Sequence, residues 1–252
     1  MNEQLLKCTV TLAERMLVAG AEVHRVEECV GRICYAYGAA RADAFITTSN
    51  MVVTVETVEG EFLTQTRRLS GTGINMAKVH ALSNLARRVV AERPALPELE
   101  EMLEQASRSR RYPRWLQVFS YVVIAGAFTI FFGAADWREA LISAVIGSIV
   151  GVAAQFSERF SLNKALERFV GSFLACLLAF CAVRWGAVTT ADKIIIGNIM
   201  SLIPGTGLTN AIRDLFTGDV FTGILRSIEA ILLALAIAAG YVIAVFLMGG
   251  GF

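Results

Sequence analysis

Hydrophobic positions follow one pattern in the first half of this chain and another in the second. Val23, Val26 and Val30 lie three or four residues apart, with charged residues between them. This spacing is typical of a helix with one buried face and one solvated face. After residue 115 charged residues become rare, and uncharged apolar runs such as 116–135 follow one another. The change predicts a water-exposed first part and a membrane-spanning second part.

The first part, residues 1–108, is expected to be a small cytosolic α+β domain. Between two helical stretches the sequence becomes rich in Val, Ile, Thr and Phe, which favours strands. Glu59-Gly60 separates two of these strands and indicates a hairpin. The expected elements are helices over 2–18, 22–37 and 75–92, an antiparallel meander of 43–49, 51–58 and 61–67, and a helical connector over 98–108.

The second part, residues 109–252, is expected to be an all-α transmembrane domain. A helix needs about 20 predominantly apolar residues to cross the hydrocarbon core of a bilayer. The fourth apolar run contains Pro204-Gly205-Thr206-Gly207, and proline ends or kinks a helix because it lacks an N–H. We therefore expect five transmembrane helices, the fourth broken at 204–207. The expected spans are 116–135, 138–156, 169–188, 194–212 and 227–249.

Composition and charge support this division. Of 252 residues, 55% are hydrophobic, and the mean hydropathy is +0.57, which is too apolar for an ordinary soluble domain. The first 114 residues carry 29 of the 45 charged side chains. The net charge of +1 gives no reason to expect a nucleic-acid partner. The first residues lack the basic and apolar regions of a signal peptide, so we expect them to stay in the cytoplasm.

The positions of arginine and lysine predict the orientation in the membrane. Cytoplasmic loops of membrane proteins carry an excess of these residues. Arg108, Arg110, Arg111 and Arg114 precede the first span, and the loop after the second span is also basic. We expect a multi-pass protein with a cytoplasmic N-terminus and, after five spans, a C-terminus outside.

Cysteine and histidine give little support to metal or disulfide chemistry. The five cysteines form no CxxC pair, and His24 and His80 are the only histidines in the sequence. We expect no metal site and no cofactor. Gly147 and Gly151 form a GxxxG motif, which predicts close packing between membrane helices.

The broken fourth run is the first candidate site. Discontinuous membrane helices have unpaired backbone groups at their broken ends, and transporters often bind substrate there. Polar side chains at bilayer depth are costly unless partnered, so they mark candidate sites. Packing between helices is the alternative interpretation. The candidate substrate-binding residues are Asn198, Ser201, Pro204, Gly205, Thr206, Gly207, Asn210, Arg213 and Arg226.

The charged residues after the break form the second candidate group. An arginine there would attract a substrate carboxylate, and a nearby acidic side chain would carry a proton. The candidate proton-coupling residues are Asp214, Asp219 and Glu229. Arg226 and Glu229 lie three residues apart and could form an ion pair on one helix face. Interfacial charge that fixes the topology is the other interpretation, and both remain open.

The segment Gly20–Glu28, with the sequence GAEVHRVEE, is the third candidate. Two carboxylates and a histidine can perform acid–base chemistry, so a membrane-tethered hydrolase using Glu22, His24 and Glu27 is one hypothesis. A solvated helix face with internal ion pairs is the other. The sequence contains no HExxH motif, nucleophile elbow or phosphate-binding loop.

Two segments, GAEVHRVEE and IPGTGLTNAIRDLFTGDVFTGILRSIEA, together resemble the bacterial threonine/serine exporter family. The resemblance covers essentially the whole chain and is closest to the larger, YjjP-like subunit of the two-gene form. It implies a secondary exporter of the inner membrane, not an enzyme, that moves threonine and serine or succinate-type dicarboxylates by proton antiport. The family's cytosolic motif corresponds here to Gly20, Glu22, Arg25 and Glu27.

The resemblance also implies a protein partner. Fused members of the family carry a second membrane domain after the first, so we expect a small YjjB-like membrane subunit in an oligomer with this chain. A sensor that binds a metabolite without transporting it is a third hypothesis, beside the exporter and the hydrolase.

Overall fold

The computed structural model describes residues 1–47, 49–69, 73, 75–108, 112–160 and 163–248. The chain divides into two compact units. The N-terminal unit combines Met1–Arg110 with Thr209–Ser227, and the membrane unit combines Arg111–Leu208 with Ile228–Phe252. A segment of the second half of the sequence thus belongs with the first half in space.

Helices form most of the N-terminal unit. The first begins where the Asn2 side chain accepts a hydrogen bond from the Leu5 N–H at 2.9 Å, the usual arrangement of an N-cap. Leu6, Val26 and Leu82, from three different helices, are fully buried in one hydrophobic core. The helices are α1 (Glu3–Val18), α2 (Val23–Ala36), α3 (Met76–Glu92) and α4 (Leu96–Ser107).

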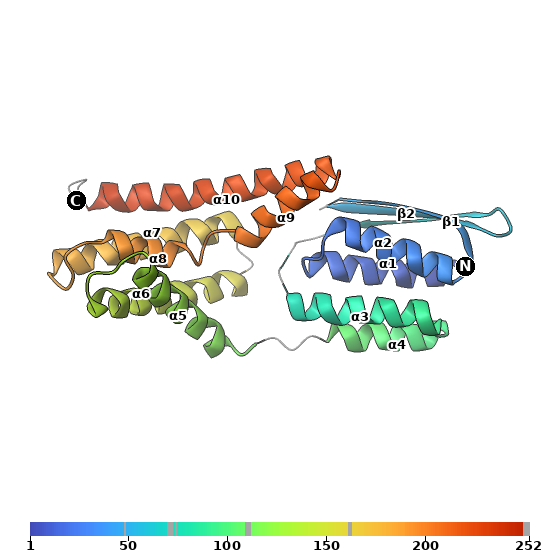
Figure 1. The fold of residues 1–252 in the computed structure, drawn as a ribbon, viewed down its shortest axis with the longest axis horizontal. Coiled ribbons are helices and arrows are strands. Elements are labelled where there is room, and N and C mark those ends of the chain that lie inside the picture. The colour runs from blue at the N-terminus through green and yellow to red at the C-terminus, as the bar shows by residue number, and fades with distance from the viewer. Residues whose placement is uncertain (48, 70–72, 74, 109–111, 161–162, 249–252) are drawn as a thin grey trace. The chain divides into compact units, whose positions relative to one another are not determined.

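A three-stranded antiparallel sheet packs against α1 and α2 (Figure 1). On the central strand, Met51, Val53 and Val55 are buried and alternate with more exposed residues. This period of two is expected where one face of a sheet covers a core. The meander predicted from the sequence is confirmed, with the bounds β1 (Ala39–Ile46), β2 (Asn50–Thr57) and β3 (Phe62–Arg68).

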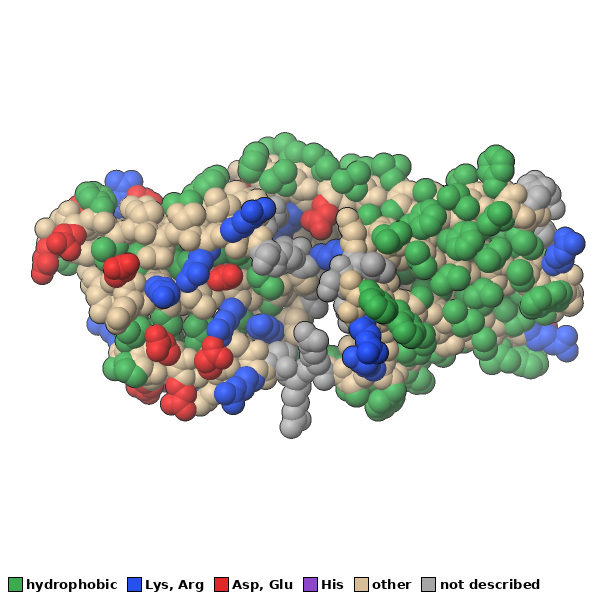
Figure 2. Space-filling view, turned by 180° about the vertical axis from the view of Figure 1, so that it is seen from behind, with side chains coloured by type: hydrophobic (Ala, Val, Ile, Leu, Met, Phe, Trp, Pro, Cys, Tyr) green, Lys and Arg blue, Asp and Glu red, His purple; other side chains and the backbone are tan. Residues whose placement is uncertain are grey.

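Four of the described helices are long and apolar enough to cross a membrane. Large hydrophobic side chains on them face outward, and Phe131 and Phe246 are 78% and 81% exposed. Hydrophobic side chains accordingly cover the visible face of the membrane unit (Figure 2). The chain is therefore a mostly helical, multi-pass membrane protein. The four helices are α5 (Arg114–Phe131), α6 (Trp137–Arg159), α7 (Lys164–Arg184) and α10 (Val220–Leu247).

Two of these helices begin at least five residues earlier than the predicted spans. α7 begins at Lys164 rather than at 169, and α10 begins at Val220 rather than at 227. Their first two turns contain charged residues, among them Glu167 of α7 and Arg226 of α10. A search for uncharged runs starts too late because charged side chains are tolerated near the ends of membrane helices.

The GxxxG motif brings α6 directly against α5, as its sequence predicted. A Cβ atom on Gly147 would lie 2.7 Å from the Cβ of Ala125, and one on Gly151 would lie 3.1 Å from the Cβ of Tyr121. Small residues at these positions allow the two helix backbones to approach closely.

The fourth apolar run consists of two short helices, α8 (Asp192–Ile199) and α9 (Gly205–Phe216). The break therefore lies at 200–204 rather than at 204–207, so it begins four residues earlier than expected, and residues 205–207 are helical. The Pro204 carbonyl accepts the Leu208 N–H at 3.0 Å, which places the proline at the start of the new helix. Proline is tolerated there because its missing N–H has no partner to lose. Neither short helix is long enough to cross a bilayer alone.

Candidate functional site

A tight turn connects α9 to α10 and brings charged residues together in the N-terminal unit. Gly218 has φ 92°, a left-handed conformation that glycine adopts without strain. The Asp219 N–H then donates to the Asp214 carbonyl at 2.9 Å, and the Thr217 hydroxyl donates to the Arg213 carbonyl at 3.1 Å. These bonds satisfy the last carbonyls of α9 and let α10 start at once.

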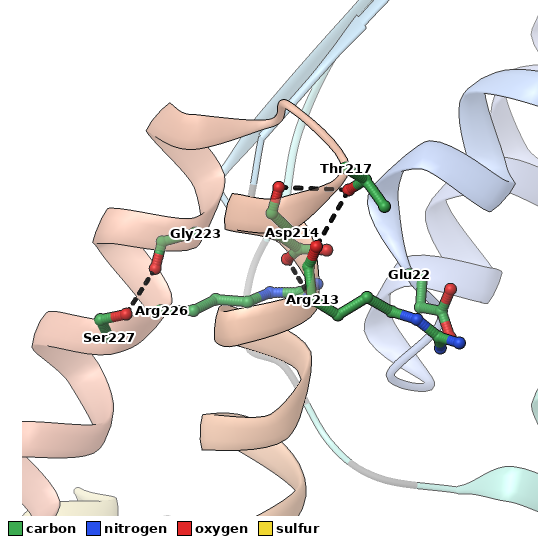
Figure 3. A network of polar contacts seen from close by, with 7 residues as sticks. All are labelled: Glu22, Arg213, Asp214, Thr217, Gly223, Arg226 and Ser227. Carbon is green, nitrogen blue, oxygen red and sulfur yellow. Dashed lines mark hydrogen bonds and ion pairs between the residues drawn. The ribbon is translucent and has the colours of Figure 1, made fainter.

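A buried ion pair joins the two helices beside this turn (Figure 3). Arg226 Nη1 donates to Asp214 Oδ2 at 2.8 Å, and the two side chains are 14% and 3% exposed. Burial raises the pKa of the Asp214 carboxyl above its ordinary value, although the guanidinium of Arg226 opposes this shift. Asp214 therefore takes up a proton more readily than an exposed aspartate.

Arg213, the neighbour of Asp214 in the sequence, points to a different side of α9 and pairs with Glu22 (Figure 3). Glu22 is the N-cap residue of α2 and belongs to the cytosolic motif expected from the sequence. The two side chains are 59% and 30% exposed, so the pair contributes little stability. Its importance is positional, because it connects α9 with residues almost 200 positions earlier in the chain.

Acidic side chains outnumber arginines in this group. Glu27 accepts the Ile46 N–H at 3.2 Å, and burial raises the pKa of its carboxyl, with a further contribution from the negative charge of Asp219. Asp219 and Glu22 likewise raise the pKa of Asp214. Four carboxylates thus interact around two arginines, Arg213 and Arg226. Among the residues that the structure describes, no three acidic, histidine or cysteine side chains are arranged to hold a metal ion.

Thr222 belongs to this site and was not singled out from the sequence. It is 1% exposed, and within the described part of the chain its hydroxyl has no hydrogen-bond partner. Thr222 precedes Arg226 by one helical turn, so both side chains lie on the same face of α10. This four-residue spacing is the signal in the sequence that could have identified Thr222 as a site residue. A buried, unpaired hydroxyl one helical turn before Arg226 is a suitable contact for a polar ligand.

Asn198 lies in a separate polar cluster, inside the membrane unit. Its Nδ2 donates to the Ser143 hydroxyl at 2.9 Å and to the Ile194 carbonyl at 3.0 Å. The Thr129 and Ser143 hydroxyls are 2.7 Å apart, and all three polar side chains are at most 1% exposed. The cluster joins α5, α6 and α8. Sequence reasoning identified Asn198 but neither Thr129 nor Ser143, since single hydroxyl residues in apolar runs are common.

The remaining predicted residues surround the break or lie elsewhere. The Ser201 hydroxyl donates to the Asn198 carbonyl at 2.8 Å in the turn after α8. The predicted pairing of Arg226 with Glu229 is wrong, because Asp214 already neutralises Arg226 and Glu229 approaches Lys164 at 3.9 Å. Pro204–Gly207 and Asn210 form the start and middle of α9, Gly20 lies in the turn before α2, and Arg25 is exposed on α2.

Comparison with known proteins gives one consistent result. A family model described as "Putative threonine/serine exporter" matches residues 7–248. The chain is 28% identical to "Probable succinate transporter subunit YjjP" of Klebsiella aerogenes, over 93% of this chain and 90% of that protein. The protein of the same name from Escherichia coli K12 is 27% identical, over 93% and 91%. "Probable threonine/serine exporter" of Mycobacterium tuberculosis H37Rv is 23% identical, over 96% of this chain and 46% of that protein. No solved structure matches the chain.

Proposed function

Because this chain belongs to the threonine/serine exporter family, we propose that it exports small zwitterionic amino acids such as threonine and serine, in exchange for protons. The observation that carries this proposal is the buried Arg226–Asp214 ion pair, surrounded by more carboxylates than arginines. The substrate, the coupling and the residues below are all part of the proposal.

A zwitterion can insert into an ion pair without leaving either charged partner unpaired. Its carboxylate would take the place of Asp214 on the Arg226 guanidinium, and its ammonium group would pair with the freed Asp214 carboxylate. Asp219 lies within electrostatic range of Asp214 and would favour the same ammonium group. The free hydroxyl of Thr222 is a further contact for a polar substrate. A dianion would leave Asp214 buried without a cation, which is costly.

Proton coupling follows from competition at Asp214. A proton on this carboxyl removes the charge that holds the substrate ammonium group, so proton and substrate exclude each other. Because burial raises the pKa of Asp214, this competition occurs at a higher pH than for an exposed aspartate. Substrate binding is expected above this pKa and is lost as the pH falls through it. Mutually exclusive binding is what an antiporter requires.

The break at 200–204 is proposed to be the hinge of the transport path. We propose that residues 194–212, in α8 and α9, form a fourth span, which gives five spans in the inner membrane with the N-terminus in the cytoplasm and the C-terminus outside. Asn198, Ser201, Pro204–Gly207 and Asn210 would line the path, with Asp214 favoured over Asp219 and Glu229 as the proton carrier. Half-helix ends at such breaks offer unpaired backbone groups to a substrate.

A partner subunit is part of the same proposal. The relatives from Klebsiella aerogenes and Escherichia coli are named as transporter subunits and match this chain over nearly its whole length. We therefore propose that a small membrane protein of the same family completes the exporter in an oligomer. The exposed hydrophobic faces of α5 and α10 would contact lipid or this partner.

Export of a succinate-type dicarboxylate is the second candidate function. It is favoured by the names of the same two relatives. The two candidates differ in what happens at Asp214, since a dicarboxylate would bind with a proton rather than against one. Efflux of each substrate at two external pH values therefore separates them.

The test is efflux from cells that express the chain with its partner and are preloaded with threonine or succinate. We expect Arg226→Ala and Asp214→Ala each to lower threonine efflux by about tenfold or more, because each removes one of the two charged groups that would hold the substrate. Arg41→Ala is the matched control, since Arg41 forms an exposed pair with Asp43 in the same unit. Efflux at the wild-type rate in both variants would contradict the site.

A further inference from the structure

A groove between α2 and α3 lies in the N-terminal unit and has a volume of about 280 Å³. Arg25 and Arg32 line it from α2 and lie seven residues apart, so they share one helix face. Ser83 and Arg87 line it from α3 and lie four residues apart, again on one face. Two helices thus bring three arginine side chains to the lining of one small space.

The positive charge of this groove is only partly compensated. Glu28 is the one acidic residue in its lining, and it pairs with Arg32 at 2.5 Å. Arg87 donates to the neutral amide of Asn84, and within the described residues Arg25 has no carboxylate partner. Three arginines and one carboxylate leave an excess of positive charge, which attracts anions.

Ser83 adds a second and independent observation. Its hydroxyl oxygen is buried in the lining of the groove and has no hydrogen-bond partner among the described residues. A buried polar atom without a partner is unfavourable, so such an atom is expected to meet a ligand or solvent. A hydroxyl can donate to the oxygen of an anion.

We propose that this groove binds a small soluble oxyanion, a phosphate or carboxylate compound, held by Arg25, Arg87 and Ser83. The planar guanidinium group fits two oxygens of such an anion at once, and the hydroxyl supplies a third donor. The volume lies just below the range of about 300–1,000 Å³ for drug-sized ligands, which suits a small metabolite. The site is separate from transport chemistry and does not depend on the proposed substrate.

The test uses the full chain purified in detergent, with radiolabelled inorganic phosphate in equilibrium dialysis at about 20 mM salt, where screening is weak. We expect about one phosphate per chain. Arg25→Ala and Arg87→Ala should each weaken binding by about tenfold, as expected for a lost charge-assisted contact. Displacement of the label by succinate but not by acetate would identify a dicarboxylate ligand, and resistance to succinate would identify a phosphate compound; both support the site.

Arg88→Ala is the matched control because Arg88 is the next residue on α3, pairs with Glu92, and does not line the groove. Its phosphate affinity should stay within about twofold of wild type. All three arginines are exposed, so the variants are expected to fold, and an unchanged thermal unfolding curve verifies this. Absence of phosphate binding up to about 10 mM, a concentration that would detect even millimolar affinity, overturns the proposal. Equal loss in Arg87→Ala and Arg88→Ala also overturns it.

Discussion

Single charged residues that are removed from water form the centre of the proposed site. Asp214 is 3% exposed, and its charge is compensated by Arg226 at 2.8 Å. A buried ion pair adds little net stability, because both charges lose their hydration. Removal of one partner is a different matter, since it leaves an uncompensated charge inside the protein. The pair is therefore stable when complete and sensitive to any molecule that competes for one of its members.

We expect Arg226→Ala to lower the free energy of unfolding by about 3 kcal/mol, because Asp214 is left buried without its cation. The double variant Asp214→Asn/Arg226→Ala should recover about half of that loss, since no charge is then left unpaired. Thermal unfolding of the full chain in detergent measures both changes. A single variant as stable as wild type would show that the pair is not buried in solution.

The sequence identifies these residues but not their pairing. Arg213, Asp214 and Arg226 are conspicuous as charges between apolar segments, and they could be proposed as site residues from that alone. Which arginine meets which acid depends on the turn at Gly218, which sets the rotation of α10 relative to α9. Helical spacing suggested Arg226 with Glu229, yet a partner on the adjacent helix is closer than one on the same helix.

At the scale of elements, α8 is held by hydrogen bonds and close packing against α5 and α6. Asn198 bonds Ser143 of α6, and Thr129 of α5 is hydrogen-bonded to Ser143 in turn. Gly197 lets α8 approach so closely that a Cβ there would lie 2.2 Å from Thr129 Oγ1 and 2.8 Å from the Ala125 carbonyl oxygen. α8 is thus anchored, so motion at the break is expected in α9.

Gly197→Ala tests this anchoring. The added methyl group has no room against backbone atoms of α5, so we expect a loss of about 1–3 kcal/mol in stability. Gly126→Ala is the control in the same unit, because the nearest atom to its Cβ would lie at an ordinary 3.5 Å. Thermal unfolding of both variants in detergent gives the comparison. Equal stabilities for the two would mean that α8 does not contact α5 as described.

The break itself could be predicted from the sequence, but its exact place could not. Proline signals both the end of one helix and the start of the next, and the two cases differ only in which residues before it keep their hydrogen bonds. Here residues 200–204 form turns and Pro204 starts α9. Packing determines where the break lies. Leu202 lies inside the break and is 1% exposed, buried in the core of the membrane unit.

At the scale of the whole molecule, the division into two units is the main result that local patterns could not give. Hydropathy separates a charged half from an apolar half, yet residues 209–227 belong with the N-terminal residues. That association rests on contacts between distant residues, such as Glu22 with Arg213, and sequence periodicity carries no information about them. In the proposed exporter, this arrangement would let the N-terminal unit respond to the state of α9.

The distribution of basic residues makes the proposed topology testable. Alkaline phosphatase is active only outside the cytoplasm, so fusions report the side of each loop. We expect activity for a fusion after Ala187 and for one after Leu247, and none for a fusion after Phe160, because the basic residues Arg159 and Lys164 flank that loop. Activity after Phe160 and inactivity after Leu247 would reverse the proposed orientation.

The most direct measurement of proton and substrate competition at Asp214 is the pH dependence of threonine binding to the purified exporter. In the wild type, we expect affinity to fall as the pH is lowered through the raised pKa of Asp214, with a proton released for each threonine bound at low pH. In Asp214→Asn, we expect weak binding that is independent of pH over the same interval. An identical pH profile in the two proteins would contradict the proposed coupling.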